Sequence, residues 1–219
     1  MKINFKQKFV FPKYKCDAYL INFKNFNIKS DKVYLHEEII EKIESIDGKI
    51  KVENFEPIIV MTSIDEKLYK HKDNYEINRF YLLDGHHRWD YAKNLGQINK
   101  LKCILVNYKD VRIKPYKFEL NTNTTKFESL LLQNGFQKVN NFKNSLRFNN
   151  QFYASNLYNN KMLLYNFKGE IQKSNTIIPI GDKRISTKKI VSFTPIVLED
   201  ILNLNYLLPP KSTWITPRI

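Results

Sequence analysis

The sequence predicts an α+β fold in which short strands and helices surround one central motif. The apolar run 80–83 stops at Asp84-Gly85 and leads into a helix-like segment that ends near Gly96. A second strand-like run covers 101–108, and a β-branched run covers 58–60. A strand, a turn, a helix and a strand in this order predict a compact core.

Length and composition place this core in a globular chain. With 219 residues, of which 42% are hydrophobic, the chain can bury one core with a lobe added to it. We expect a core over residues 1–115 and a C-terminal α/β lobe over 116–219. Cys16 and Cys103 lie far apart and lack metal-ligand spacing, which predicts thiols in a reducing compartment. No apolar run approaches the roughly 20 residues that span a bilayer, and we expect a cytoplasmic location without a membrane partner.

The net charge is strongly positive but not concentrated. A formal charge of +14 and a pI near 9.6 would suit nucleic acid. The lysines are scattered, however, and no stretch forms a basic arm or a one-sided basic face. The charge therefore argues only weakly for nucleic acid, and it also suits an anionic nucleotide.

The first half of the chain shows strand and helix patterns in turn. Residues 1–34 alternate apolar with polar side chains and predict one or two strands, including 18–23. Residues 36–48 predict a helix whose acidic first turn holds Glu37 and Glu38. Its apolar face consists of Leu35, Ile39, Ile43 and Ile46. Residues 62–78 form a polar excursion in which His71 is expected to be exposed.

The second half is less regular. Residues 127–136 predict a short helix capped by Gly135, and 196–202 predict another. Residues 151–157 and 161–167 are strand-like, and the Asn159-Asn160 pair between them indicates a hairpin.

The central motif carries the clearest functional signal. Gly85 allows a tight turn with positive φ, so the turn lies at a helix N-terminus, where N–H groups and the helix dipole attract anions. His86, His87 and Arg88 add side-chain donors and make a phosphate receptor. The carboxylate of Asp84 is a candidate ligand for Mg²⁺ held against that phosphate.

Plainer interpretations stay open for each of these residues. Histidines in such a turn can be solvent-exposed, and Asp84 can shape the bend alone. Glu37 can be an ordinary first-turn residue of a helix. Near the end of the sequence, Lys211, Ser212 and Thr213 follow two prolines and form another anion-binding cluster or a solvated tail.

The motif Asp84-Gly85-His86-His87-Arg88-Trp89, with Ala92 and Leu95-Gly96 behind it, resembles the ParB/sulfiredoxin-like domains, and among them most closely the free serine kinases. The resemblance extends in the same order along about half of the chain. Its other segments are Leu35-His36-Glu37-Glu38, Pro57-Ile58-Ile59-Val60, Val106-Asn107-Tyr108 and Pro210-Lys211-Ser212-Thr213.

This resemblance implies a fold and a reaction. The fold would be a ParB/sulfiredoxin-like core that binds a nucleotide, with a lobe that completes the acceptor site. The reaction would be phosphorylation of L-serine, or a similar small hydroxylated acceptor, to O-phospho-L-serine, with Mg²⁺ and ATP or ADP.

The resemblance also implies residue roles. Glu37 would be the base, and Asp84 would be a second catalytic carboxylate that holds the metal. The nucleotide phosphates would lie in a cradle of Gly85, His86, His87 and Arg88. The substrate would contact His36, Lys211, Ser212 and Thr213. Phosphoryl transfer asks mainly for positioning and charge neutralisation, which suits these residue types.

One departure from the family bears on the substrate. Trp214-Ile215 stands where the family continues with Arg-His, so another acceptor than serine stays open, and Arg218 is a candidate for the missing cation.

Three other functions compete with the kinase. A ParB-like nucleotide-dependent DNA-binding protein would suit the charge, but no helix-turn-helix pattern follows the core. A sulfiredoxin-like reductase needs a cysteine where His86 stands. A non-catalytic sensor would not need both Glu37 and Asp84.

Overall fold

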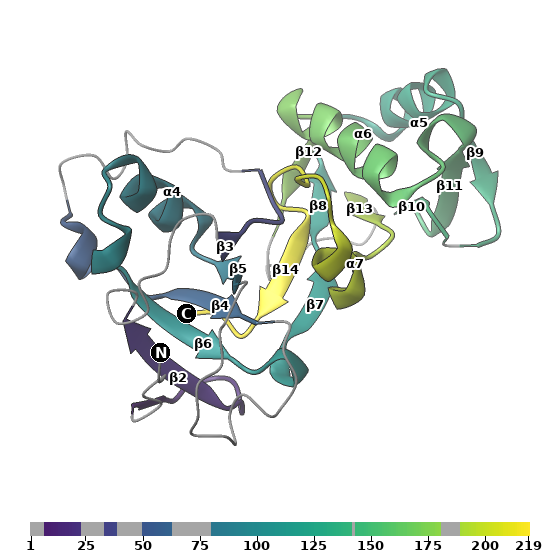
Figure 1. The fold of residues 1–219 in the computed structure, drawn as a ribbon. Helices are drawn as coiled ribbons and strands as arrows, with labels where there is room; N and C mark the ends of the chain where they lie inside the picture. The colour runs from purple at the N-terminus through teal and green to yellow at the C-terminus, as the bar shows by residue number, and fades with distance from the viewer. Residues whose placement is uncertain (1–6, 23–32, 39–49, 63–79, 142, 181–188) are drawn as a thin grey trace. The chain divides into compact units, whose positions relative to one another are not determined.

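The computed structural model describes residues 7–22, 33–38, 50–62, 80–141, 143–180 and 189–219. The chain divides into two compact units, and the second is inserted in the sequence of the first (Figure 1). The first unit contains Met1–Arg112 and Ile215–Ile219, and the second contains Ile113–Trp214. We expected all of 116–219 in the C-terminal lobe, but the last five residues belong to the first unit.

The first unit is built on a mixed six-stranded sheet with the order β1-β2-β6-β4-β5-β3. β4 runs parallel to β6 and antiparallel to β5, and β3 runs parallel to β5. The strands are β1 (Lys8–Phe9), β2 (Ala18–Asn22), β3 (Val33–Tyr34), β4 (Ile58–Met61), β5 (Phe80–Asp84) and β6 (Lys102–Val106). In the described part of this unit, the helical segments are α4 (His86–Asn94), η2 (Val52–Asn54), η3 (Ile98–Lys100) and η4 (Tyr108–Asp110).

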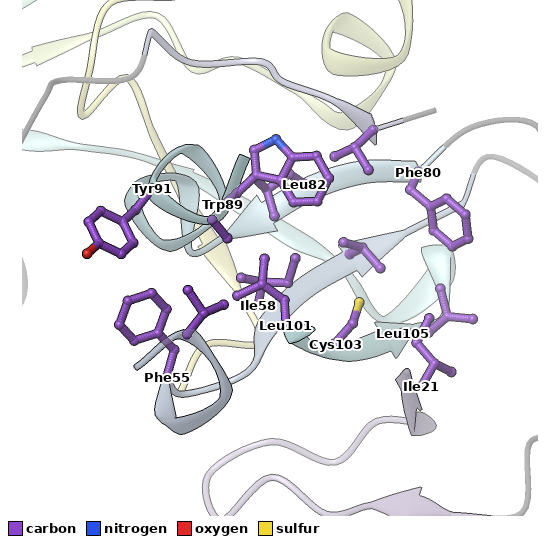
Figure 2. Close-up of a cluster of buried hydrophobic side chains, with 14 residues drawn as sticks. Ile21, Phe55, Ile58, Phe80, Leu82, Trp89, Tyr91, Leu101, Cys103 and Leu105 are labelled. Atoms are coloured by element: carbon purple, nitrogen blue, oxygen red, sulfur yellow. The ribbon is translucent and has the colours of Figure 1, made fainter. Parts of the chain in front are cut away.

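A buried core lies between α4 and one face of this sheet. Alternate residues of each strand point to the same face, and Ile58, Leu82 and Cys103 all reach the cluster. Figure 2 shows Trp89 beside Leu82 and Tyr91 facing the Phe55 ring, whose centroid lies 5.7 Å from that of Tyr91. This packing fixes α4, and with it the turn that precedes it, against the centre of the sheet.

The second unit contains a six-stranded antiparallel sheet with the order β12-β8-β13-β10-β11-β9. Its strands are β8 (Lys117–Leu120), β9 (Phe136–Val139), β10 (Leu146–Phe148), β11 (Gln151–Ser155), β12 (Ile177–Pro179) and β13 (Ile190–Phe193). Its helical segments are α5 (Thr124–Gln133), η5 (Asn156–Tyr158), α6 (Lys161–Lys173) and α7 (Leu198–Asn203). The boundaries between the units fall within β7 (Arg112–Pro115) and β14 (Thr213–Thr216), which pair in a two-stranded sheet.

The α+β class is confirmed, and two local predictions are wrong. Residues 161–167 form the start of α6 instead of a hairpin strand, because the Asn160 side chain accepts a hydrogen bond from the Leu163 N–H at 2.9 Å and caps the helix. Glu37 lies in a β-bridge and Glu38 is also non-helical, so neither occupies a helical first turn. The rest of the predicted helix 36–48, and most of the excursion 62–78 with His71, lie outside the described residues.

Within the described ranges, none of the helices combines the length and the apolar character needed to cross a lipid bilayer.

Candidate active site

The site begins where β5 meets α4. Ile59 pairs with Asp84 and Val60 pairs with Leu82, so Leu83 is an extra residue that makes a bulge in β5. Bulges of this kind redirect side chains near functional sites. Here the bulge directly precedes Asp84, whose side chain is 16% exposed at the end of the strand.

Gly85 forms the cap between the strand and the helix. Its φ is +91°, a left-handed conformation that side chains rarely adopt, and its carbonyl accepts the first helical hydrogen bond from the Trp89 N–H at 2.9 Å. A Cβ at this position would lie 2.7 Å from Ile58 Cγ2 and 2.9 Å from Arg88 Nη2. Both the backbone conformation and the lack of space for a Cβ therefore require glycine in this turn.

Arg88 lies in the first turn of α4 and pairs with Glu56, two residues before β4. Its Nη1 donates to Glu56 Oε2 at 2.9 Å, and the Glu56 side chain is 69% exposed. Its Nε is buried and has no hydrogen-bond acceptor within the described part of the chain. A buried guanidinium donor beside a helix N-terminus fits an anionic oxygen, because the helix dipole and the cation attract the same group.

The segment with His36 and Glu37 reaches the start of α4. The His36 ring packs edge-on against the His86 ring, with 4.9 Å between centroids, and is almost fully buried. His36 Nε2 lies 3.8 Å from Glu37 Oε1, and the Glu37 side chain is 14% exposed. The two predicted site segments, which are about 50 residues apart in sequence, therefore meet in one place.

Burial lowers the pKa of His36 below its ordinary value. The Glu37 carboxylate and a hydrogen bond with the Leu82 backbone act in the opposite direction, but desolvation is the larger effect. His36 is therefore a neutral imidazole near pH 7, and its contact with Glu37 leaves the carboxylate without a full counter-charge from that ring.

Arg218 enters this site from the far end of the sequence. Its Nη2 lies 3.0 Å from Asp84 Oδ1, and its side chain is 27% exposed. Both residues belong to the first unit, although 134 positions separate them. The sequence suggested Arg218 only as a substitute for a cation of the related family, and no local pattern pointed to its pairing with Asp84.

The Lys211, Ser212 and Thr213 cluster belongs to the second unit. Ser212 and Thr213 are buried, while Lys211 is partly exposed and has a φ of +61°. The Ser212 hydroxyl donates to the Pro209 carbonyl, so its proton is used inside the turn.

A metal ion would need Asp84. Within the described ranges no three His, Cys, Asp or Glu side chains are grouped so that they could hold a metal. Mg²⁺ commonly uses one or two protein carboxylates together with substrate phosphates, so a carboxylate such as that of Asp84, beside a helix N-terminus, is of the type that this ion prefers.

Comparison with known proteins supports the fold class first. No family model matches the chain. Several solved structures are similar in fold. A C-terminally truncated SbnI from Staphylococcus aureus has a TM-score of 0.63 and 14% identity, and the match covers 91% of this chain and 82% of that one. A free serine kinase in complex with AMP has a TM-score of 0.57 and 18% identity, and the match covers 94% of this chain and 91% of that one. The predicted ParB/sulfiredoxin-like fold is thereby confirmed.

Sequence comparison then supports the narrower resemblance. An ATP-dependent L-serine kinase from Desulfurococcus mucosus is 32% identical over 93 residues, which cover 41% of this chain. The matched stretch spans about a third of that relative's length, 32%. Together with the structural neighbours, this match confirms the resemblance to the free serine kinases.

Proposed function

We propose that this protein is a small-molecule kinase that transfers a phosphoryl group from ATP or ADP to the hydroxyl of free L-serine or a similar small acceptor. The main support is the contact between the His36 ring and the His86 ring at the start of α4, together with the 3.8 Å distance between His36 Nε2 and Glu37 Oε1. A carboxylate base, an anion-binding helix N-terminus and a candidate metal ligand are the parts that phosphoryl transfer requires. The similar proteins, an ATP-dependent L-serine kinase and a free serine kinase with AMP, agree with this reaction.

The donor phosphates would bind at the start of α4. Gly85 forms the left-handed turn at the helix N-terminus, and His86, His87 and Arg88 would donate hydrogen bonds to phosphate oxygens. Asp84 would hold Mg²⁺, which supplies charge neutralisation on the phosphates when it is bound. Arg218 would keep Asp84 oriented through Oδ1 and add a second cation to the site.

Glu37 would act as the base. It would accept the proton of the acceptor hydroxyl while that oxygen bonds to the terminal phosphorus of the donor. The bond from phosphorus to the bridging oxygen would break, giving ADP from ATP or AMP from ADP, together with the phosphate ester. A neutral His36 suits this role, because a positively charged imidazolium in contact with the Glu37 carboxylate would stabilise the anion and weaken it as a base.

The acceptor would be bound by its own anionic group. The family resemblance assigns His36, Lys211, Ser212 and Thr213 to it, and we retain that assignment as part of the proposal. The buried hydroxyl of Ser212 would contribute by shaping the turn around Lys211. We place the reaction in the cytoplasm, where both nucleotides and free amino acids are available.

The proposal is tested by mixing the protein with L-serine, Mg²⁺ and either ATP or ADP and following O-phosphoserine by ³¹P NMR. A panel with threonine, homoserine and glycerate in place of serine would identify the acceptor, because Trp214-Ile215 departs from the related family at this point. A variant with Glu37→Gln is the matched negative control. Absence of any phosphorylated product from the whole panel would refute the kinase.

A ParB-like nucleotide-dependent DNA-binding protein or regulator is the second candidate, supported by the net charge of +14. The described part of the second unit separates α5 from α6 by three strands, which is not a helix-turn-helix arrangement. A gel-shift titration with rising salt distinguishes the two functions, since binding to DNA phosphates weakens steeply as salt increases.

A further inference from the structure

A buried lysine on α6 is the most unusual side chain of the second unit. Lys168 is completely buried, although lysine is almost never fully buried without polar partners. Its ammonium donates to the Pro210 carbonyl and lies 3.5 Å from the Pro209 carbonyl and 3.4 Å from Ser212 Oγ. An ammonium has three N–H donors, and these three oxygens all belong to one turn.

The ammonium also makes a cation–π contact. Lys168 Nζ lies 5.3 Å from the centroid of the Phe118 ring on β8, at a cation–π distance. Burying a cation costs free energy unless its hydrogen bonds are made, so the Lys168 ammonium depends on the oxygens of this turn for its hydrogen bonds.

The next residue of α6, Gly169, packs against the same turn. A Cβ at Gly169 would lie 2.9 Å from Cγ and 3.0 Å from Cβ of Pro209. Glycine inside a helix costs about 1 kcal/mol relative to alanine. Here the cost is offset by close contact between the helix and the proline, so two consecutive residues of α6 fit the shape of one loop.

The turn itself needs support. Pro209 and Pro210 lack N–H groups and cannot anchor the segment by donating backbone hydrogen bonds. Lys211, with its φ of +61°, has a left-handed backbone that costs a non-glycine residue about 1 kcal/mol or more. Such a conformation persists when its surroundings enforce it, and the Ser212 hydroxyl and the Lys168 ammonium both bind the carbonyls directly before it.

We propose that Lys168 is a positioning residue, which fixes the Pro209–Ser212 turn so that Lys211 is presented in one conformation to an anionic group of the acceptor. This inference rests on the proposed function, because it assumes that Lys211 binds the acceptor. Lys168 does not touch the substrate; it acts through Lys211.

The first test measures steady-state kinetics of Lys168→Met, with Lys173→Met at an exposed position of the same helix as the matched control. We expect the KM for the acceptor to rise at least tenfold, while the KM for the nucleotide changes less than twofold. The double variant with Lys211→Met should be no worse than Lys211→Met alone, because both changes remove the same interaction. Equal rises in both KM values, or additive effects in the double variant, would overturn the proposal.

The second test does not depend on catalysis. Hydrogen exchange of the Lys211, Ser212 and Thr213 amides should become at least tenfold faster in Lys168→Met and stay unchanged in Lys173→Met. Unchanged exchange in Lys168→Met would overturn the inference even if the kinase is active. If the wild type phosphorylates no acceptor, the proposed function fails, and the exchange data still decide whether Lys168 holds the turn.

A third variant covers the case in which Lys168→Met does not fold. Gly169→Ala keeps the ammonium but forces Pro209 away from α6. It should raise the acceptor KM and speed exchange of the same amides in the same direction, and no effect on either would contradict the proposal.

Discussion

Replacing Gly85 by alanine tests how the turn between β5 and α4 is built. The left-handed backbone costs about 1–2 kcal/mol for a residue with a side chain. The new Cβ would also lie 2.7 Å from Ile58 Cγ2, and Ile58 is fully buried in β4. Overpacking of that kind costs about 1–3 kcal/mol, so Gly85→Ala should lower the free energy of unfolding by about 2–5 kcal/mol.

Gly96 provides the matched control at the other end of α4. Its φ is +63°, and a Cβ there would meet nothing within 4 Å. The Gln97 N–H binds the Ala92 carbonyl at 2.8 Å around it, which is a Schellman cap. Gly96→Ala should therefore cost only the backbone contribution, about 1–2 kcal/mol. Effects on the unfolded chain are the same for both changes and cancel in the comparison.

The assay is urea unfolding followed by the fluorescence of Trp89, which is 1% exposed in the core of the first unit. The chain has two tryptophans, so Trp214→Phe in all variants removes the second signal. Nucleotide affinity should fall more than tenfold in Gly85→Ala and stay near the wild-type value in Gly96→Ala, because the Arg88 guanidinium must yield to the new Cβ. Equal losses of stability and equal nucleotide affinity in the two variants would refute this account of the turn.

Three further predictions concern the residues around the turn. Glu37→Gln should lower turnover by about 10²–10⁴ if Glu37 is the base, whereas Glu38→Gln should leave turnover unchanged; normal turnover with reduced stability in Glu37→Gln would show that Glu37 is structural only. If the proposed kinase site is right, Arg218→Gln should lower turnover by about 10²-fold or more in a steady-state assay, because it removes the cation paired with Asp84, and Arg218→Lys should keep part of the activity. Burial lowers the pKa of His36, so below about pH 6.5 the unfolded state binds a proton at this residue more readily than the folded state does. The free energy of unfolding should therefore keep its full value above that pH and fall below it by at most about 1.4 kcal/mol per pH unit. In His36→Gln, urea midpoints between pH 5 and 8 should lose this component, and an unchanged pH profile would show that His36 does not titrate in this way.

Local chemistry made the central motif predictable from the sequence. Gly85 and Gly96 both have positive φ, at the two ends of the helix that the pattern predicted. The strand runs at 58–60 and 80–83 were equally clear, because apolar stretches between turn residues form buried strands.

Other features could not be found by reading adjacent residues. The Asn159-Asn160 pair looked like a hairpin turn, but Asn160 caps α6, and the two uses of asparagine have the same sequence signature. Lys168 was not singled out by the sequence pattern, because its partners come from a turn more than 40 positions away. The pairing of Arg218 with Asp84 spans 134 positions, and no periodic pattern carries information over that separation.

Because the second unit is inserted in the sequence of the first, the two parts of the first unit are translated at different times. A ribosome releases β5, the turn and α4 early, but residues 215–219 emerge only after the whole insert has been made. Asp84 is therefore translated more than a hundred residues before Arg218, and the ion pair between them can form only after that. Nascent chains that stop before Arg218 contain the turn between β5 and α4 but lack the guanidinium that pairs with Asp84.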